Sequence, residues 1–557
     1  MSIEDRTRVS SRRSHGLWAC VAACAVLFHA GCAGLDRDEI VKATSRVDEP
    51  AVEPTPGPDV AELFASYQTR LSELSSRWNT EPLRIGIGKQ VFYDDAVLAT
   101  KLNFVRKMGR VTKANDGKPV IEATQKWETP QSKTGVGTAI SVVRRPDGLF
   151  QAWYNCGRST YYGTLDIGYA ESTNGVDWTK PYKRSVLYPC HAGGVYYDPY
   201  EKRAKYRYKI AYGDTAGSDP PLIFGHSDNG GQWSRYSSFH NINEEHNFRV
   251  DTINNLFYDD ELGAYRVFSR SRVGSRVRGM KQFIKPGFDD ASLSSLVTGG
   301  RRAAPVLAVQ EEMPPVGDSY CFSAHKSGGL YIGKMSFYYE SVHYCLALSR
   351  NGVTWDWKYL GITNAFIPRG PPGSFDAGAV WAGVTPFVEV GDELFIYYGG
   401  MTKPYNNSTV VPPLGSPEPH LSAIGLAKIR LDGVFHLESI SMSGVVETRL
   451  FVWEGSSLKL NIDASLGEAV VEMLGEDGKP IPGFTGSDAD RITTDATGMT
   501  VTWGKRSDLT GLKGKVVKVR IKTIGFVKMY AFEVVGDSSQ TAVSPAGDEL
   551  LNTGDPS

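Results

Sequence analysis

Four carboxylic acids stand just before apolar stretches of the chain, where they could take part in acid–base chemistry. They are Glu128, Asp251, Asp318 and Asp376. Carboxylates that converge on one pocket can hydrolyse a glycosidic bond, because one protonates the leaving oxygen while another acts as nucleophile or activates water. Repulsion between them raises one pKa and keeps that acid protonated at neutral pH. Acids before a strand are also common turn and capping residues, so each has a structural alternative.

Further candidates for binding a ligand occupy the same kind of position. They are Trp127, His191, Arg249, Asn254, Tyr320 and Trp381. Aromatic rings with a few polar groups are typical of small-molecule pockets and could stack on sugar rings. Several arginines between Arg266 and Arg278 could face an anionic sugar or form a solvated strand face. No spacing of Cys, His, Asp and Glu indicates a metal site, and no cofactor is predicted.

A short motif that occurs three times points to the elements that must position these residues. It has the form Ser-x-Asn-Gly-x-x-Trp, at Ser172–Trp178, Ser227–Trp233 and Ser349–Trp355, and each copy follows an apolar run. Asn-Gly predicts a type I′ turn between two strands, because Asn tolerates positive φ and Gly adopts it freely. The Trp is expected to fold back over the turn and to pack there.

The spacing of the copies predicts the fold. Their asparagines lie 55 and then 122 residues apart, about one and two periods, with weaker units at Gly279–Asp290 and Ile424–Gly433. Repeats of this length indicate small sheets arranged radially. We therefore predict an all-β chain with a five-bladed β-propeller over residues 81–436, in which Gln90–Leu98 is expected to pair beside the last blade and close the ring. Residues before each inner strand would then meet at the mouth of the central channel.

The first 32 residues predict an exported chain. Arginines from Arg6 to Arg13 precede an apolar run, Leu17–Phe28, which is too short to span a membrane. The sequence Ala-Gly-Cys that ends at Cys32 resembles a bacterial lipobox. The resemblance implies lipidation of Cys32 and a membrane-anchored lipoprotein in the periplasm or at the bacterial cell surface.

The rest of the chain divides by composition. Residues 33–58 are acidic and proline-containing, which predicts a flexible linker, and residues 59–80 begin with a capping box and predict a helix. Residues 437–536 alternate apolar and polar side chains, as in an antiparallel β-sandwich, and residues 537–557 are predicted to be disordered. The sandwich is expected to support the propeller, with sugar binding as the alternative. A net charge of −1 gives no reason to expect nucleic acid or an anionic membrane as partner.

Four cysteines lie outside the first 32 residues. An exported chain permits disulfides, and a bridge between Cys156 and Cys190 is left open. Cys321 and Cys345 are expected on the first and third strands of one blade, which is too far apart for a bridge.

With its repeated turns and its acids placed just before strands, the chain resembles the five-bladed β-propeller glycosidases of glycoside hydrolase families 32 and 43. The likeness lies in the hairpin Tyr169–Pro181 and in Asp392–Gly400, and the C-terminal part resembles the family-32 sandwich. It implies an O-glycosyl hydrolase in which one acid is nucleophile or base, one is general acid and a third orients them. Which of the four candidate acids takes which role is left open.

Two alternatives remain beside this interpretation. The family-32 opening motif of Asn-Asp-Pro type is missing, and His191 stands where those families place an acid, which favours a glycan-binding propeller without catalysis. A sialidase-like enzyme ranks lower, because sialidase repeats have one more residue before the Gly and sialidases have six blades. In every case the expected partner is a carbohydrate, and a membrane is met only through the lipid anchor.

Overall fold

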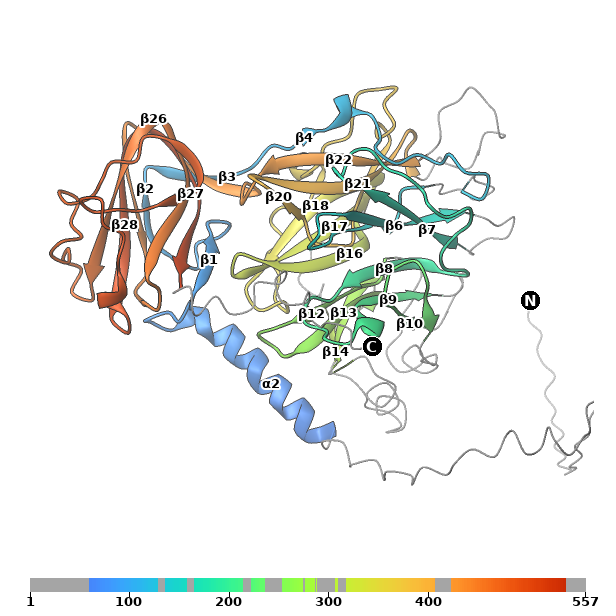
Figure 1. Ribbon diagram of the computed structural model, residues 1–557, viewed down its shortest axis with the longest axis horizontal. Helices are drawn as coiled ribbons and strands as arrows, with labels where there is room; N and C mark the ends of the chain where they lie inside the picture. The colour runs from blue at the N-terminus through green and yellow to red at the C-terminus, as the bar shows by residue number, and fades with distance from the viewer. Residues whose placement is uncertain are drawn as a thin grey trace, which may run out of the picture. The chain divides into compact units, whose positions relative to one another are not determined.

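The computed structural model describes residues 60–128, 136–157, 165–213, 222–235, 253–273, 276–285, 287, 306–308, 317–405 and 422–536. Within them the chain is nearly all β, with one α-helix, α2 (Val60–Ser76), near its start (Figure 1). The prediction of an all-β chain with a short N-terminal helix is confirmed. None of the helices in these ranges is long and apolar enough to cross a membrane. Cys32, the linker and the C-terminal tail lie outside the described residues.

Five small antiparallel sheets, here called sheets I to V, follow one another along the described chain. Sheet I contains β5 (Ser141–Arg144), β6 (Phe150–Gly157) and β7 (Leu165–Ser172); sheet II contains β8 (His191–Tyr197), β9 (Tyr208–Gly213), β10 (Leu222–Ser227) and β11 (Ser234–Arg235); sheet III contains β12 (Asn255–Asp259), β13 (Ala264–Val273), β14 (Arg276–Lys285) and β15 (Val306–Ala308); sheet IV contains β16 (Asp318–Ser327), β17 (Leu330–Tyr339) and β18 (Ser341–Ser349); sheet V contains β19 (Ala379–Ala382), β20 (Val388–Val390), β21 (Glu393–Met401), β22 (Ser422–Arg430) and β4 (Thr112–Lys113).

Hydrogen bonds join each of these sheets to the next in a closed cycle. They run from Val195 N–H to Ser141 Oγ (3.0 Å, I–II), Asn254 N–H to Ala192 O (3.1 Å, II–III), Ala324 N–H to Asn255 Oδ1 (2.9 Å, III–IV), Ser323 Oγ to Gly383 O (2.9 Å, IV–V) and Val384 N–H to Ile140 O (2.7 Å, V–I). All five bonds involve residues in or next to the first strand of a sheet. These strands therefore surround one central region.

The expectation that Gln90–Leu98 closes the ring is wrong. β1 (Gly88–Val91) pairs instead with the C-terminal strand β28 (Val516–Val535), with Gly88 opposite Val534. The strand at the free edge of sheet V is β4, in which Lys113 lies opposite Ala427. Both strands are too short for their own pattern to choose a partner. The burial of Phe92, which follows β1, in the C-terminal core fixes the pairing of β1.

The remaining strands form a nine-stranded sheet, here called the C-terminal sheet (Figure 1). Its strands are β1, β2 (Leu98–Leu102), β3 (Phe104–Met108), β23 (Phe435–Ser439), β24 (Ser443–Thr448), β25 (Phe451–Val452), β26 (Ser457–Gly475), β27 (Asp495–Thr500) and β28. A core around the buried Trp453 and Trp503 supports it. Three of its strands precede sheet I in sequence, so the segment from residue 81 to Met108, assigned above to the propeller, pairs with this sheet. Whether it is a sandwich stays a prediction.

Helix α2 packs against sheet III. Tyr67 and Leu71 contact the apolar group of Leu262, Ala264 and Ile284. Arg70 Nη1 also donates a hydrogen bond to Leu262 O at 2.6 Å. The helix is therefore held by burial of one side and by a specific bond to the β12–β13 turn.

The three Asn-Gly turns differ from the type I′ prediction. Only the glycines have positive φ, at 76° for Gly175, 78° for Gly230 and 70° for Gly352. In each copy the Asn Oδ1 accepts N–H bonds from the residues two and three positions on, and the Ser Oγ accepts those of the Asn and the Gly. The side chains of Ser and Asn thus shape the turn, which is why Asn needs no left-handed conformation.

Each of these turns is also fastened to the preceding sheet through its glycine carbonyl. Tyr397 Oη donates to Gly175 O at 2.8 Å, Trp153 Nε1 to Gly230 O at 2.7 Å and Gln282 Nε2 to Gly352 O at 2.6 Å. The predicted folding back of the Trp is confirmed in two copies, where Trp178 and Trp233 also donate to the glycine carbonyl. The motif therefore connects sheets.

Gly230→Ala is expected to destabilise the protein more than Gly148→Ala. Both glycines have positive φ, at 78° and 88°, so both changes bear the cost of a left-handed alanine, about 1 kcal/mol. A Cβ at Gly230 would in addition lie 2.4 Å from Trp153 Cζ2, whereas at Gly148 it meets only the end of Arg144 at 3.9 Å. We expect a further loss of about 1–3 kcal/mol for Gly230→Ala from overpacking. Chemical denaturation of both variants measures it, and equal losses would contradict this packing.

The four cysteines that follow residue 32 are all free. Cys156, Cys190, Cys321 and Cys345 are buried and form no disulfide. Cys321 and Cys345 lie on β16 and β18, the first and third strands of sheet IV, as expected. The Cys156–Cys190 bridge that the sequence left open is not made.

Candidate functional site

The starts of the first strands meet in one apolar cluster. Ala139 of sheet I, Ile253 of sheet III, Cys321 of sheet IV and Ala379 of sheet V are packed together with Trp381. These residues are far apart in sequence and are brought together only by the cyclic order of the sheets. The predicted convergence of strand starts is thus seen for four of the five sheets.

A group of aromatic side chains, here called the aromatic group, lies on this cluster. It consists of Tyr320, Tyr338, Trp381 and Tyr405. The Tyr320 ring is 5.1 Å from that of Trp381, and Tyr405 is 5.2 and 5.1 Å from these two, all edge to face. The Tyr320 and Tyr405 hydroxyls are 2.7 Å apart. Two predicted binding residues, Tyr320 and Trp381, are therefore in contact, whereas Tyr405 was missed because it follows its strand instead of preceding one.

A β-bulge explains the placement of Tyr320. The register between β16 and β17 shifts between Ser319 and Cys321, so Tyr320 is the extra residue, and a bulge re-aims its side chain. The guanidinium of Arg270 lies 5.6 Å from the centre of its ring. Burial and the neighbouring Tyr405 raise the pKa of Tyr320, so its hydroxyl stays a proton-bearing donor at neutral pH.

Asp318 is the candidate acid closest in sequence and structure to the aromatic group. It is the first residue of β16, half-buried, two residues before Tyr320 and directly opposite Tyr338. Two other candidates, Asp251 and Arg249, lie outside the described residues. The structure therefore places one predicted carboxylate beside the aromatic rings.

Glu128 is instead enclosed in a network of protein donors. Its side chain is fully buried, and Tyr154 Oη donates to Oε1 at 2.6 Å. Lys180 Nζ lies 2.7 Å from Oε2, which also accepts the N–H bonds of Thr124 and Gln125. An acid held in this way serves as a structural anchor, as in the capping alternative stated for the four acids.

Asp376 has the same kind of surroundings. Its side chain is 1% exposed, and its Oδ2 lies 2.5 Å from Lys113 Nζ and 2.9 Å from Tyr398 Oη. Ser374 Oγ donates to Oδ1 at 2.8 Å. This acid therefore links β4, through Lys113, to β21, through Tyr398, within sheet V.

The remaining predicted binding residues fall in different places. His191 is the first residue of β8 and is half-buried. Asn254 is fully buried, donates to Ala192 O at 3.3 Å and accepts from Ser269 Oγ at 2.7 Å, so it fixes the junction of sheets II and III. Trp127 packs in the cluster of sheet I and sheet V side chains that includes Ile121 and Ile424, apart from the aromatic group.

Sheet IV contains the buried basic groups His325 and Lys334, which lie close together. His325 is 3% exposed with its ring 4.8 Å from that of Phe387, and neither ring nitrogen has a hydrogen-bond partner among the described residues. Lys334 is 1% exposed and donates to the carbonyls of Val384 and Thr385. Burial lowers the pKa of both groups well below their ordinary values, and for His325 the charge of Lys334 adds to the effect.

These shifts predict a loss of stability in mild acid. The folded protein disfavours the charged ring of His325. Above the unfolded pKa of 6.5 the ring is neutral in both states and does not affect the free energy of unfolding. Below pH 6.5 the unfolded state takes up a proton, and the free energy of unfolding falls by up to about 1.4 kcal/mol per pH unit. Replacing His325 by Leu should flatten the dependence of unfolding free energy on pH between 7 and 5. Parallel slopes for the variant and the wild type would show that His325 is not the group that titrates.

The described residues contain no group of three or more His, Cys, Asp or Glu side chains that could hold a metal ion. What the strand starts do contain is one carboxylate, a buried guanidinium and four aromatic rings with hydroxyl or indole donors. This combination suits a neutral, hydroxyl-rich ligand that stacks on apolar rings.

Comparison with known proteins gives fold likenesses alone. No family model and no curated protein matches the chain. Solved structures that resemble it include an N-acetylgalactosamine deacetylase from F. plautii (14% identity, TM-score 0.40, covering 58% of this chain and 96% of that one) and a putative glycoside hydrolase from Parabacteroides distasonis (12%, 0.37, 57% and 97%). Another is described as belonging to a family of mannoside phosphorylases that contains glycoside hydrolases (14%, 0.38, 57% and 94%). Function is therefore argued from the site.

Proposed function

We propose that the protein is an exported glycoside hydrolase that cleaves a polysaccharide or oligosaccharide where the first strands of a five-bladed propeller begin. The observation that supports it is Asp318, placed opposite Tyr338 and two residues from Tyr320, at the edge of the aromatic group. Rings of this group would stack on a sugar, and Asp318 would then lie next to the linkage.

The roles of the acids follow from their surroundings. Glu128 and Asp376 each touch a lysine and a tyrosine hydroxyl in a buried setting, so neither is offered to a substrate. Hydrolysis needs two carboxyl groups. We assign one role to Asp318 and the other to Asp251, the remaining acid predicted at a strand start. Which is the general acid and which the nucleophile or base is left open.

A second candidate function is glycan binding without catalysis. It is favoured by the same two buried networks, because they remove two of the four candidate acids from chemistry. His191 at the start of sheet II, where an acid was expected, points the same way. The aromatic group would serve either function.

The two candidates are separated by one assay on the chain from residue 33 onward. The purified protein is incubated with a panel of plant and algal polysaccharides and aryl glycosides, and reducing ends are measured. The same glycans are set in affinity gels. Release of sugar supports the hydrolase, whereas retardation in a gel with no release from any glycan supports the binder. Neither release nor retardation would overturn both.

The location of the protein is proposed from its sequence. Lipidation at Cys32 would hold it on a bacterial membrane, in the periplasm or at the cell surface. Labelling with a radioactive fatty acid, with and without Cys32→Ser, tests this, and equal labelling of both chains would contradict it.

A further inference from the structure

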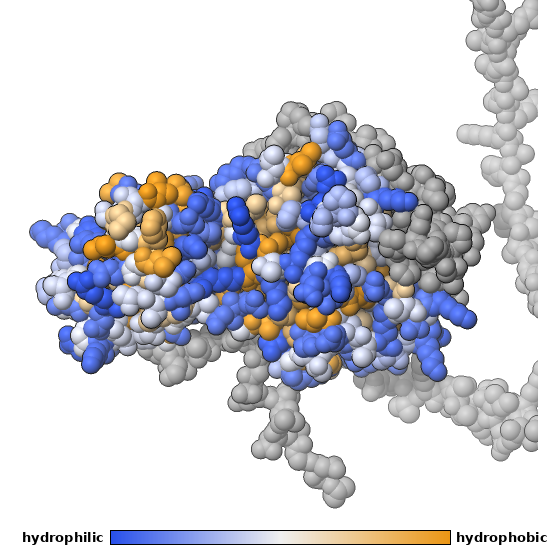
Figure 2. All heavy atoms as spheres, turned by 90° about the horizontal axis from the view of Figure 1, so that it is seen from above, coloured by the Kyte–Doolittle hydropathy of each residue, from blue (hydrophilic) through white to orange (hydrophobic). Residues whose placement is uncertain are grey.

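The C-terminal sheet has an exposed apolar surface, here called the apolar patch. It consists of the six most exposed large apolar side chains in the described residues, 56–77% exposed: Leu102, Ile440, Met442, Leu466, Ile524 and Phe526. The other large apolar side chains that are exposed in the described residues are less so, at 37–53%. Figure 2 shows apolar atoms gathered on the part of the molecule that this sheet forms. An apolar surface of this kind marks an interaction site.

Strand pairing shows that the six side chains are neighbours. Leu466 lies directly opposite Phe526. Gly525, between Ile524 and Phe526, donates its N–H to Met442 O at 2.9 Å. Ile440 N–H donates to Asn103 O at 2.9 Å, next to Leu102, which ends β2. The patch is therefore one continuous surface built from four segments of the chain.

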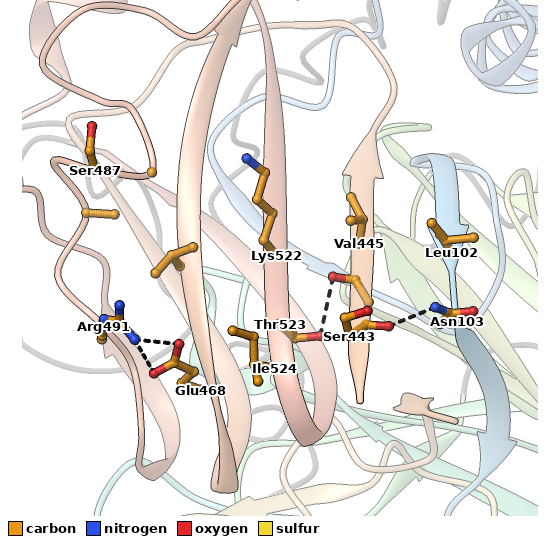
Figure 3. Close-up of a pocket in the computed structure, with 14 residues that line it drawn as sticks. Leu102, Asn103, Ser443, Val445, Glu468, Ser487, Arg491, Lys522, Thr523 and Ile524 are labelled. Carbon is orange, nitrogen blue, oxygen red and sulfur yellow. Dashed lines mark hydrogen bonds and ion pairs between the residues drawn. The ribbon is translucent and has the colours of Figure 1, made fainter. Parts of the chain in front are cut away.

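A hollow of about 510 Å³ adjoins the patch (Figure 3). Leu102, Val445, Val470 and Ile524 line it with apolar atoms. The ion pair of Arg491 and Glu468, and Lys522, contribute the charged groups. Leu102 and Ile524 belong to both the patch and the hollow, so the two form a single apolar region with charges beside it.

Lysines flank the apolar residues on the outer side of β28. Lys522, Ile524, Phe526 and Lys528 alternate with the buried residues 523, 525 and 527, so these four side chains share one side of the strand. Lys101 precedes Leu102 on β2, and Lys107 lies on β3. Lys101, Lys107 and Lys522 each form an ion pair, with Asp95, Glu438 and Glu472 respectively, so the cations around the apolar side chains are partly neutralised.

Several members of the patch sit on turns and bends. Ile440 and Met442 lie between β23 and β24, and Leu102 precedes Asn103, whose φ is 62°. Leu466 follows an irregularity in the pairing of β26 with β28. Apolar side chains on turns fit a fluid apolar layer, into which each side chain can insert independently of the others.

We propose that the apolar patch inserts into the surface of a lipid bilayer. The chain outside the described residues argues for this occupant. Between the predicted lipidated Cys32 and α2 there are 27 residues, which reach about 90 Å when extended and about 30 Å on average. An anchor this close keeps the local concentration of bilayer high, so weak insertion of a few side chains is enough. The proposal is independent of the glycosidase assignment.

The test uses the chain from residue 33 onward, which has no acyl group and lacks the apolar run of the leader. It is sedimented with vesicles of phosphatidylcholine and phosphatidylglycerol in equal amounts. Leu466→Ser combined with Phe526→Ser should weaken binding at least ~10-fold, since each side chain contributes the transfer of a full apolar group. The matched control combines Tyr339→Ser with Ile362→Ser, two exposed apolar residues of sheet IV and its following loop, and should bind as wild type does.

Three results would overturn the proposal. In the first, the wild type stays in the supernatant. In the second, the patch variant binds vesicles as tightly as the control variant. In the third, light scattering shows that the wild type is a dimer and the patch variant a monomer. The last result would make a second copy of the chain the occupant. Should the double variant melt at a lower temperature, Leu466→Ser alone replaces it, because that side chain is the most exposed, at 77%.

Discussion

Asp318→Asn is expected to lower kcat/KM by at least ~10³-fold on any glycan that the wild type cleaves, with the melting temperature within about 2 °C of wild type. Asparagine has nearly the shape of aspartate but can neither transfer a proton nor form a glycosyl ester, and proton transfer alone contributes 10²–10⁴-fold. Asp318 is half-buried at the start of β16, and Asn keeps its size and its ability to accept a hydrogen bond, so we expect the fold to be kept. Initial rates on the cleaved glycan and a thermal melt measure the two effects.

Glu128 and Asp376, the other two candidate acids in the described residues, provide matched controls. Their variants are expected to lose stability and keep activity, the opposite of Asp318→Asn. Glu128→Gln removes the carboxylate that pairs with Lys180, and Asp376→Asn removes the one that pairs with Lys113. The side chains of these lysines are only 9% and 19% exposed. Breaking a buried pair from one side costs about 3–5 kcal/mol. We expect both variants to melt at lower temperature and to keep their kcat/KM per folded molecule. Loss of activity without loss of stability in either would reassign that acid to the reaction.

Arg266→Met is expected to destabilise the protein by about 3–5 kcal/mol. Arg266 is fully buried, its Nε lies 2.5 Å from Asp259 Oδ2, and it also donates to Asn351 O at 2.9 Å in the Asn-Gly turn of sheet IV. Its guanidinium lies 4.9 Å from the centre of the Tyr331 ring. The change would leave Asp259 buried with Tyr331 Oη, 2.7 Å away, as its remaining side-chain partner. Denaturant unfolding at pH 7 measures the loss.

The pH dependence of this effect has a definite sign. Burial alone would raise the pKa of Asp259, but the charge and hydrogen bond of Arg266 outweigh it and hold the pKa below the ordinary 3.8. The stabilisation is therefore present above pH 3.8 and is lost as pH falls through the folded pKa. The difference between wild type and Arg266→Met should shrink in strong acid.

A surface pair serves as the control for Arg266. Arg203 lies 2.9 Å from Glu201 but is 53% exposed. Exposed pairs contribute about 0–1 kcal/mol, so Arg203→Met should stay within that range. If both arginine variants lost the same stability, burial would not be what makes the Asp259–Arg266 pair important.

The repeats show how far local pattern reaches. Ser-x-Asn-Gly-x-x-Trp predicts a turn after a strand, and all three copies form one, because the Ser and Asn side chains satisfy the backbone within the motif itself. The type I′ assignment failed for the same reason: those side-chain bonds remove the need for positive φ at Asn. What the motif could not reveal is its fastening to the preceding sheet by Tyr397, Trp153 and Gln282, since these donors lie 222, 77 and 70 residues away.

The candidate site, too, was only partly predictable from the sequence. Sequence order was enough to name Asp318, Tyr320 and Trp381, because residues before inner strands converge wherever sheets are arranged in a cycle. It was also enough to list Glu128 and Asp376, but not to separate them from Asp318. Their lysine and tyrosine partners come from other segments: Lys180 lies 52 residues after Glu128, and Lys113 lies 263 residues before Asp376.

The sequence by itself determined the all-β class, the repeating turns and the set of acids at strand starts, since all three follow from local periodicity and turn chemistry. Tertiary structure alone decided which acids are neutralised in buried pairs and that β1 joins the C-terminal sheet. It also decided that six apolar side chains from four segments form one exposed surface. The physical reason is that burial and charge pairing depend on neighbours in space, and folding brings these neighbours together from hundreds of residues apart.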